Sequence, residues 1–327
     1  MLEKSAAIVQ MSSAPIAVVA LGGNALLPRG ERLEASTQLR AARVAARTLG
    51  SVVGDYRLVV THGNGPQVGL LALMNDAYPE VDPYPLDILD AESVGQIGYV
   101  IELELDNAID SNDTVALITR VVVDEADPAF GEPTKFIGPV YDEATARSLE
   151  AERGWTVRPD GDSWRRVVPS PEPRQIVQLP AIRRLVDDGF VVVCAGGGGV
   201  PVVAENGGHR GVEAVIDKDL CSALLAADLG ADVLVLATDV DGVFLGWGSD
   251  EQRMIGEITS EELRAHDFAA GSMGPKVEAA CRFAEGAGGR AAIGALDDLE
   301  ELLSGTTGTQ VSGASRPTAT PKLGEDR

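Results

Sequence analysis

The stretch "IAVVALGGNALLPRG", Ile16–Gly30, joins an apolar run directly to a turn that contains two glycines. The run Ile16–Leu21 is continuously apolar, which is typical of a strand buried on both faces of a parallel sheet. Glycines such as Gly22 and Gly23 let backbone N–H groups approach an anion closely. The stretch therefore predicts a buried strand followed by a phosphate-type loop. Its nearest cation, Arg29, lies six residues beyond Gly23, so we expect the positive charge to come from elsewhere in the chain.

The same pattern of a strand followed by glycines occurs twice more. The run "RLVVT", 57–61, leads through His62 to Gly63-Asn64-Gly65, and "FVVVCA", 190–195, leads to Gly196–Gly199. Any one of these turns is equally well interpreted as a structural loop. Because ligands of parallel α/β sheets bind beyond the carboxyl ends of the strands, three such turns predict one shared site.

Two asparagines occupy matching places in the first two glycine turns. Asn24 and Asn64 could each offer an amide to a small planar anion, or could simply adopt the left-handed turn conformation that asparagine tolerates. None of the turns has the G-x-x-x-x-G-K-[ST] form of a P-loop, and none reads G-x-G-x-x-G before a helix. Both a P-loop and a dinucleotide fold are therefore disfavoured.

Strand-like and helical segments alternate along most of the chain, which predicts an α/β fold with a mostly parallel sheet covered on both faces. We expect strands at 16–21, 57–61, 114–123, 291–294 and 305–311, a strand from 190 that ends in the four glycines at 196–199, and a strand followed by a turn at 232–244. Helices are expected at 33–49, 65–77, 90–109, 143–153, 179–187, 217–229, 275–286 and 296–303. Residues 1–15 and 312–327 are expected to be loose tails flanking a domain at 16–311. Residues 124–170, rich in Pro, Gly and acids and with a hairpin near Gly161, are interpreted as an inserted subdomain or lid.

Composition excludes several classes of protein. The net charge of −23 over 327 residues argues against binding nucleic acid through a basic surface. The chain shows neither a signal peptide nor a membrane-spanning run. The three cysteines and three histidines are scattered, which indicates buried reduced thiols in a cytoplasmic protein rather than a zinc site.

Lysine is scarce and its positions are informative. Only five of the 27 basic residues are lysines, and three of those five are interior. Lys135, Lys218 and Lys276 each lie in a motif containing Gly, Pro or Asp. At these places lysine offers a point charge on a flexible side chain, whereas arginine would offer a planar fork of N–H donors.

The surroundings of these lysines suggest phosphate chemistry. Asp217 and Asp219 suit a helix N-terminus because negative side chains are stabilised by the positive end of the helix dipole. That interpretation does not explain why Lys218 lies between them. The alternative is that Lys218 faces phosphate oxygens and Asp219 orients a lysine. Lys276 opens a helix whose free N–H groups favour an anion, although it could be a solvated surface lysine. Lys135 lies on the inserted segment and could reach over the site.

At these motifs the chain resembles the carbamate kinases of the amino-acid-kinase superfamily. The matching segments span about residues 16 to 311, nearly the whole chain. They are "ALGGNALL", "THGNGPQVG", "PLD", "IGY", "DPAFGEPTKFIGPVY", "SWRRVVPSPEP", "GGGGVPVV", "GVEAVIDKDLCSALLA" and "GSMGPKVEAA". The sequence departs from the usual pattern at Ala91–Gln96, at Phe136 and in the turn "TDVDGVF".

The resemblance implies a three-layer αβα sandwich, a homodimer, and reversible phosphoryl transfer between ATP and carbamate with Mg²⁺ held by phosphates and water rather than by side chains. It implies that Lys135, Lys218 and Lys276 bind phosphate and that Asp219 orients lysines. The residues implied to hold carbamate and the phosphoryl group are Gly22, Gly23, Asn24, Gly63, Asn64, Gly65, Gly197 and Gly198. Those implied to border the nucleotide are Asp239, Asp241, Phe244, Met273 and Gly274. Relatives outside the carbamate kinases often carry a lysine just before the first Gly-Gly, where Ala20 stands here, so Lys135 is expected opposite Gly22-Gly23 in a closed form.

Three other functions remain open at this point. One is a related kinase acting on an acyl, phosphate or phosphonate substrate. Another is a nucleotide sensor without catalysis, which the full set of three lysines argues against. A dinucleotide-dependent dehydrogenase is the third, and the glycine spacing disfavours it. Energy production in arginine or purine breakdown is the pathway that the resemblance implies.

Overall fold

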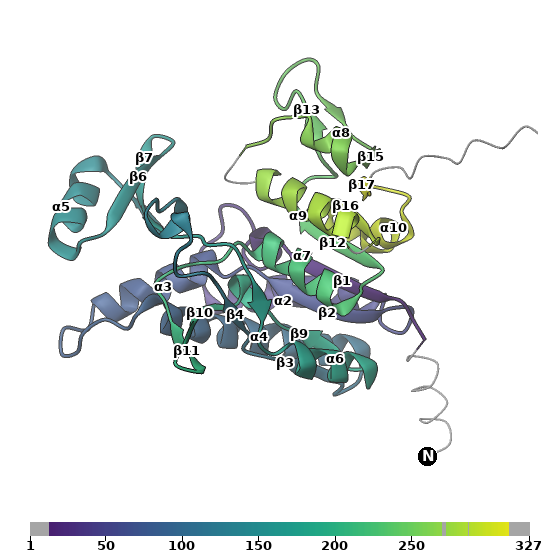
Figure 1. Ribbon diagram of the computed structural model, residues 1–327, viewed down its shortest axis with the longest axis horizontal. Coiled ribbons are helices and arrows are strands. Elements are labelled where there is room, and N and C mark those ends of the chain that lie inside the picture. Colours follow the sequence, from purple (N-terminus) through teal and green to yellow (C-terminus); the bar gives the residue numbers. More distant parts are fainter. Residues whose placement is uncertain (1–12, 270–272, 287, 314–327) are drawn as a thin grey trace, which may run out of the picture.

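An eight-stranded sheet forms the centre of the protein (Figure 1). The computed structural model describes residues 13–269, 273–286 and 288–313. From edge to edge the strands are β15 (Glu257–Thr259), β17 (Thr309–Ser312), β16 (Arg290–Ala295), β12 (Val233–Thr238), β1 (Ile16–Leu21), β2 (Arg57–His62), β9 (Val191–Val193) and β3 (Thr114–Ala116). All neighbouring pairs are parallel except β16 with β17.

Helices cover both faces of this sheet. They are α2 (Ala35–Gly50), α4 (Leu86–Ile109), α6 (Leu179–Asp187), α7 (Lys218–Leu229), α8 (Ser260–Arg264), α9 (Met273–Gly286) and α10 (Leu299–Ser304). Helix α3 (Gly65–Asp76) packs instead against α4 and the strand that begins at Lys135. Short 3-10 turns are η1 (Gly23–Ala25), η2 (Pro128–Phe130), η3 (Gly196–Gly198) and η4 (Leu296–Asp298).

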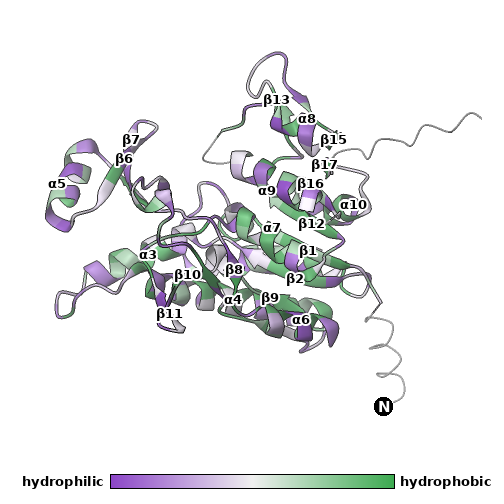
Figure 2. Cartoon of the chain, viewed as in Figure 1, coloured by the Kyte–Doolittle hydropathy of each residue, from purple (hydrophilic) through white to green (hydrophobic). Residues whose placement is uncertain are grey.

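Alternate residues of β1 enter two different cores. Val18 and Ala20 pack with apolar side chains of α6, α7 and α9, whereas Val19 and Leu21 pack with those of α2, α4 and α10. The continuous apolar run is therefore explained by burial on both faces. The strands at the centre are accordingly among the most hydrophobic segments of the chain (Figure 2). The predicted three-layer αβα fold is confirmed.

The three glycine turns lie at one edge of the sheet. Strands β1, β2 and β9 are adjacent and parallel, with Leu21 opposite His62 and Val60 opposite Val193. Strand β12 lies on the other side of β1, so the turn after Thr238 opens at the same edge. Four loops from neighbouring strands therefore open at this edge, and three of them are the glycine turns that the sequence pattern predicts there.

A small lobe projects from this body, at the left of Figure 1. It consists of β5 (Lys135–Tyr141), α5 (Glu143–Arg153), β6 (Thr156–Asp160) and β7 (Ser163–Val168), with the strands ordered β5-β7-β6 in an antiparallel sheet. Strands β6 and β7 form the hairpin expected near Gly161. Helix α5 is largely hydrophilic (Figure 2), and Ala146 is its one buried residue.

Several expected element bounds were wrong. The single strand at 114–123 is divided into β3 and β4 (Arg120–Val122), because the chain passes into a second sheet made of β11 (Gly208–Gly211), β10 (Val200–Glu205), β4 and β8 (Gln175–Ile176). The strand expected to end at the glycines is β9, and β10 follows the glycines in the second sheet. The strand and turn expected at 232–244 are β12 and the turn after it, and this segment ends at the first residue of β13 (Phe244–Leu245), which pairs with β14 (Arg253–Met254). Helix α4 starts at Leu86, four residues earlier than expected, because Leu86 is buried and Pro85 is its N-cap.

The loose tails predicted at 1–15 and 312–327 lie almost entirely outside the described residues. Within the described part of the chain, no helix combines the length and the apolar character needed to cross a membrane.

Candidate active site

The three interior lysines lie together around two aspartates. Lys218 Nζ is 2.7 Å from Asp219 Oδ1, and Lys276 Nζ donates to Asp219 Oδ2 at 2.9 Å. Lys135 Nζ donates to Asp217 Oδ2 at 2.7 Å. The lysines come from three separate elements, because Lys218 opens α7, Lys276 lies in the first turn of α9 and Lys135 opens β5.

Asp219 is held ionised by its two lysines. Burial alone would raise the pKa of this carboxyl, but the ammonium groups of Lys218 and Lys276 outweigh burial and hold the pKa well below its usual range. Asp219 is 5% exposed, so the pairs are only weakly screened by solvent. One carboxylate therefore fixes two cations side by side.

Lys218 retains hydrogen-bonding capacity. Burial lowers the pKa of this ammonium, and Asp219 opposes that shift. Lys218 Nζ forms an ion pair with Asp219, and no other described residue accepts a hydrogen bond from this buried ammonium group. A buried ammonium group whose remaining N–H donors have no partner favours an anionic ligand, because unsatisfied buried donors are costly.

Asp217 joins helix α7 to the projecting lobe. Its Oδ1 accepts from the backbone N–H groups of Asp219 and Leu220 and so caps the helix, while Oδ2 accepts from Lys135. The N-cap side chain thus holds the lysine of the inserted segment beside the other two lysines. The sequence pattern predicts Asp217 at the start of this helix, but it does not predict the pairing of Asp217 with Lys135.

These groups line one cavity of about 220 Å³. The lining residues are Gly63, Asn64, Gly65, Lys135, Gly197, Val215, Ile216, Asp217, Lys218, Asp219, Pro275 and Lys276. Of the candidate residues, the three lysines, Asp219 and members of the second and third glycine turns are brought together here. Gly22, Gly23, Asn24 and Gly198 are not among the lining residues.

The third turn requires glycine for close approach. A Cβ at Gly196 would lie 2.4 Å from the ring of His62, and one at Gly197 would lie 2.5 Å from Asn64 Nδ2. Gly197, Gly198 and Gly199 also have φ between +67° and +96°, a region that favours glycine. His62 is buried, and burial lowers its pKa to about 4. The ring is therefore neutral at pH 7 and its Nδ1 donates to Gly63 O at 3.0 Å.

Asn64 is fixed by helix α4 rather than by turn geometry. Its Nδ2 donates to Asp90 Oδ1 and, at 2.8 Å, to Ser93 Oγ. Neither Asn24 nor Asn64 has a positive φ, so the left-handed alternative is wrong for both. Asn24 is exposed on η1, whereas Asn64 is 3% exposed.

Comparison with known proteins places this site in a family. The amino acid kinase family matches residues 15–294. A carbamate kinase of Rhizobium meliloti (strain 1021) is 52% identical over 299 residues, covering 90% of this chain and 92% of that protein. A carbamate kinase of Thermococcus kodakarensis is 46% identical over 308 residues, covering 90% and 98%. The structure of carbamate kinase from Giardia lamblia bound to AMP-PNP aligns with a TM-score of 0.86 at 39% identity, over 93% of this chain and all of that one.

This chain belongs to the amino acid kinase family. It is a phosphotransferase, and its predicted resemblance to the carbamate kinases is confirmed. A dinucleotide-dependent dehydrogenase is thereby excluded.

The candidate nucleotide-side residues of this kinase lie outside the 220 Å³ cavity. Asp239 and Asp241 are in the turn after β12, Phe244 opens β13, and Met273 and Gly274 open α9. Asp239 Oδ2 is 2.6 Å from Arg29 Nε. This ion pair joins the loop after β1, which contains Arg29, to the turn after β12, which contains Asp239.

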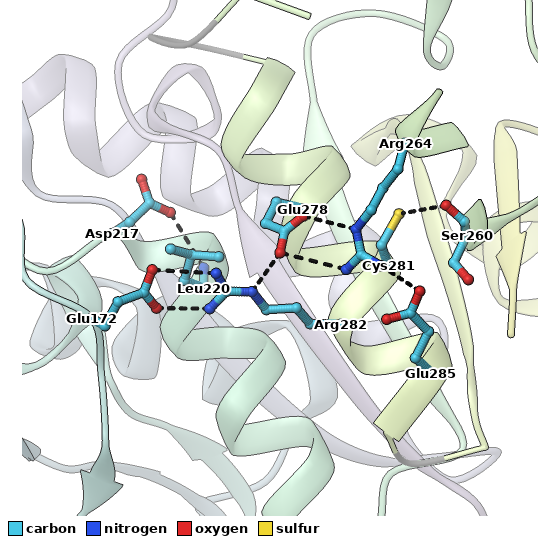
Figure 3. Close-up of polar contacts among 9 residues, drawn as sticks. All are labelled: Glu172, Asp217, Leu220, Ser260, Arg264, Glu278, Cys281, Arg282 and Glu285. Carbon is cyan, nitrogen blue, oxygen red and sulfur yellow. Dashed lines mark hydrogen bonds and ion pairs between the residues drawn. The ribbon is translucent and has the colours of Figure 1, made fainter. Parts of the chain in front are cut away.

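Ion pairs connect the middle and the end of α9 to neighbouring segments (Figure 3). Arg282 contacts Glu172, in the chain returning from the projecting lobe, at 2.7 and 3.2 Å and also contacts Glu278 at 2.7 Å. Arg264 of α8 donates to Glu278 at 3.1 Å and also pairs with Glu285. These exposed pairs contribute little free energy individually. They link α9, the helix that carries Lys276, to α8 and to the segment at Glu172.

Proposed function

We propose that this kinase transfers a phosphoryl group reversibly between ATP and carbamate, giving ADP and carbamoyl phosphate. The observation that carries the proposal is the set of three lysines around one cavity, with Lys218 buried and its N–H donors unsatisfied. The proposal is also supported by the similarity to carbamate kinases over 90% of the chain.

Phosphoryl transfer depends mainly on positioning the two substrates and on neutralising the negative charge of the phosphoryl group. In the direction of ATP synthesis, a β-phosphate oxygen of ADP attacks phosphorus while the bond from phosphorus to the carbamoyl oxygen breaks, which releases carbamate. Negative charge spreads over the phosphoryl oxygens in the transition state. Lys135, Lys218 and Lys276 would meet that charge from three elements, with Asp219 keeping two of the ammonium groups in place. No general base is required, because carbamate is already an anion.

The substrates would occupy opposite parts of the sheet edge. We infer that Gly22, Gly23, Asn24, Gly63 and Asn64, with Gly65, Gly197 and Gly198, hold carbamate and the transferring group. The nucleotide would lie toward Asp239, Asp241, Phe244, Met273 and Gly274. The order of strands supports this division, since β12 and β1 are adjacent and β2 and β9 follow.

Magnesium would arrive with the nucleotide. The two carboxylates of the cavity are already engaged by lysines, and the described residues hold no group of three metal-binding side chains. The donor set therefore fits an ion held by phosphates and water, which is how Mg²⁺ is often bound in phosphoryl-transfer sites. When bound, the ion would neutralise part of the phosphate charge.

We also propose that the lobe at 124–170 closes over the site with Lys135, and that closure brings Lys135 opposite Gly22-Gly23. The domain at 16–311 would act as a homodimer in the cytoplasm. Its reaction would run toward ATP synthesis, during the breakdown of arginine or purines. All three cysteines are free and buried, which supports a reducing compartment.

The decisive assay is ATP formation from ADP and Mg²⁺ with a panel of phosphoryl donors. We expect carbamoyl phosphate to be used far better than acetyl phosphate or other acyl phosphates. Efficient use of a different donor, with no turnover of carbamoyl phosphate, would favour another small-anion kinase. ADP binding without turnover of any donor would favour a nucleotide sensor.

A further inference from the structure

Asn64 is held at the cavity wall by two acceptors on one face of α4. Its Nδ2 donates to Asp90 Oδ1 and to Ser93 Oγ, and residues three apart share a helix face. Asp90 and Ser93 are both fully buried. Gly197 packs against the amide from the other side. The Asn64 side chain is thus enclosed by α4 and the third glycine turn.

Ser93 fixes which end of the amide faces α4. Its Oγ–H donates to Asp90 O at 2.8 Å, so its single proton is already used. Ser93 Oγ can therefore only accept from Asn64, and the atom that faces it must be the NH₂ group. The orientation of this amide thus follows from the hydrogen-bond network.

With both N–H groups used, Asn64 has only its carbonyl oxygen left to offer. No described residue hydrogen-bonds to Asn64 Oδ1, and Asn64 lines the cavity. An acceptor in that position suits a ligand that brings an N–H donor. This outcome differs from the sequence-based hypothesis that the amide would donate to an anion.

Asp90 is suited to this arrangement as an uncharged acid. Its Oδ2 is buried without a hydrogen-bond partner in the described part of the chain, and a neutral carboxyl tolerates that better than a carboxylate. Burial raises the pKa of Asp90 to about 8. Either protonation state still leaves Oδ1 as an acceptor for Asn64.

We propose that Asp90 and Ser93 are positioning residues that lock Asn64 with its carbonyl oxygen toward the cavity, so that the site selects a carbamoyl group over an acetyl group. The proposal rests on the proposed function and adds its specificity determinant. Carbamoyl phosphate carries an NH₂ group that can donate to Asn64 Oδ1. Acetyl phosphate has a methyl group of similar size there and leaves the oxygen unpaired, which sites built for a hydrogen bond reject strongly.

The test compares kcat/KM for carbamoyl phosphate and acetyl phosphate in ATP formation. Ser93→Ala and Asp90→Leu each remove one acceptor and so free the amide to rotate. We expect each to reduce the preference for carbamoyl phosphate by ~10-fold or more, the loss of a hydrogen bond worth about 1.4 kcal/mol. Most of the change should come from slower use of carbamoyl phosphate.

Two variants separate orientation from a general structural effect. Asp90→Asn keeps an acceptor for Asn64 and should retain the preference. Ser260→Ala removes a buried hydroxyl that does not line the cavity and should leave both reactions unchanged. Thermal unfolding of every variant reports whether it is folded. If Asp90→Leu does not fold, Ser93→Ala, which is the smaller change, still tests the proposal.

The proposal would be overturned if folded Ser93→Ala lost kcat/KM equally with both phosphoryl donors. It would also be overturned if this variant kept the wild-type preference for carbamoyl phosphate. The same loss of preference in Asp90→Asn as in Asp90→Leu would overturn it too. Failure of the proposed function gives a different result, because wild-type protein would then show no turnover of carbamoyl phosphate at all.

Discussion

Asp219 contacts two lysines at once. We propose that the cation missing from the first glycine turn comes from lysines of three distant segments rather than from Arg29, which pairs with Asp239. Sequence reasoning could select the lysines because they are scarce. It could not find the Lys135–Asp217 pair, whose members are 82 residues apart, since pairing of side chains depends on how the lobe lies over α7.

Removing the charge of Asp219 should destabilise the protein. Asp219→Asn leaves the buried ammonium group of Lys218 and the partly buried one of Lys276 without their shared carboxylate, and breaking a buried pair costs about 3–5 kcal/mol. We expect a clear fall in the thermal midpoint together with a loss of activity. Glu172→Gln is the matched control, because its pair with Arg282 is exposed and should contribute less than about 1 kcal/mol. Similar midpoints for the two variants would contradict this account of the cluster.

Asp90 should make stability depend on pH in the direction opposite to most carboxyls. Burial, with a smaller contribution from Asp87, raises its pKa to about 8, whereas an unfolded aspartate titrates near ~3.9. The native state therefore holds a proton that the unfolded state releases. Stability from this group is present at low pH and is lost as pH rises from about 4 to about 8, by at most about 1.4 kcal/mol per pH unit.

Asp90→Asn removes this titration. The difference in thermal midpoint between Asp90→Asn and wild type should grow in favour of the variant from pH 5 to pH 8, and should level off above that range. Because both proteins share every other titrating group, the difference isolates Asp90. A constant difference across the pH series would show that Asp90 is ionised in the native state.

Helices and strands position the cluster through close backbone contacts. Strand β5, which begins at Lys135, crosses α3 where Gly69 and Gly138 meet, and a Cβ on Gly69 would lie 2.5 Å from Gly138 Cα. The sequence could predict strands, helices and three glycine turns from local patterns. It could not predict this crossing, nor the division of 114–123 between two sheets, because both depend on contacts between remote segments.

Gly69→Ala should therefore behave unlike an ordinary helical substitution. Alanine usually stabilises a helix by about 0.5–1 kcal/mol relative to glycine, but here overpacking should cost about 1–3 kcal/mol. Displacement of β5 should also lower kcat by moving Lys135. Gly286→Ala, in α9 with no atom near its Cβ, is the control and should be neutral or stabilising. A gain in midpoint and an unchanged kcat for Gly69→Ala would argue against the crossing as the feature that places Lys135.

The whole molecule exposes apolar side chains on two neighbouring helices. Leu70, Leu73 and Met74 of α3 and Ile88, Tyr99 and Leu103 of α4 are 38–62% exposed. Clustered exposed apolar side chains mark interaction surfaces more often than free surface, which supports the proposed homodimer. The family and the fold could be predicted from long sequence motifs. The surface that we propose to contact a second chain could not, because such motifs do not specify which side chains remain exposed.

Sedimentation should accordingly give the mass of two chains for the wild type. Tyr99→Asp places a charge at the centre of the α4 stripe and should shift the protein toward one chain, while Arg147→Ala on α5 should not. Wild-type protein that sediments as a single chain at assay concentrations would count against the dimer.

ATP formation from ADP and carbamoyl phosphate, measured side by side for wild type and Lys218→Ala, tests whether the lysine cluster performs phosphoryl transfer. Lys218 is buried in the cavity with unsatisfied N–H donors, and loss of one such electrostatic donor costs about 10²–10³-fold in kcat. The predicted result is efficient ATP formation by the wild type and a fall in kcat of at least ~10²-fold in a folded variant. Near-wild-type turnover by Lys218→Ala would contradict the account.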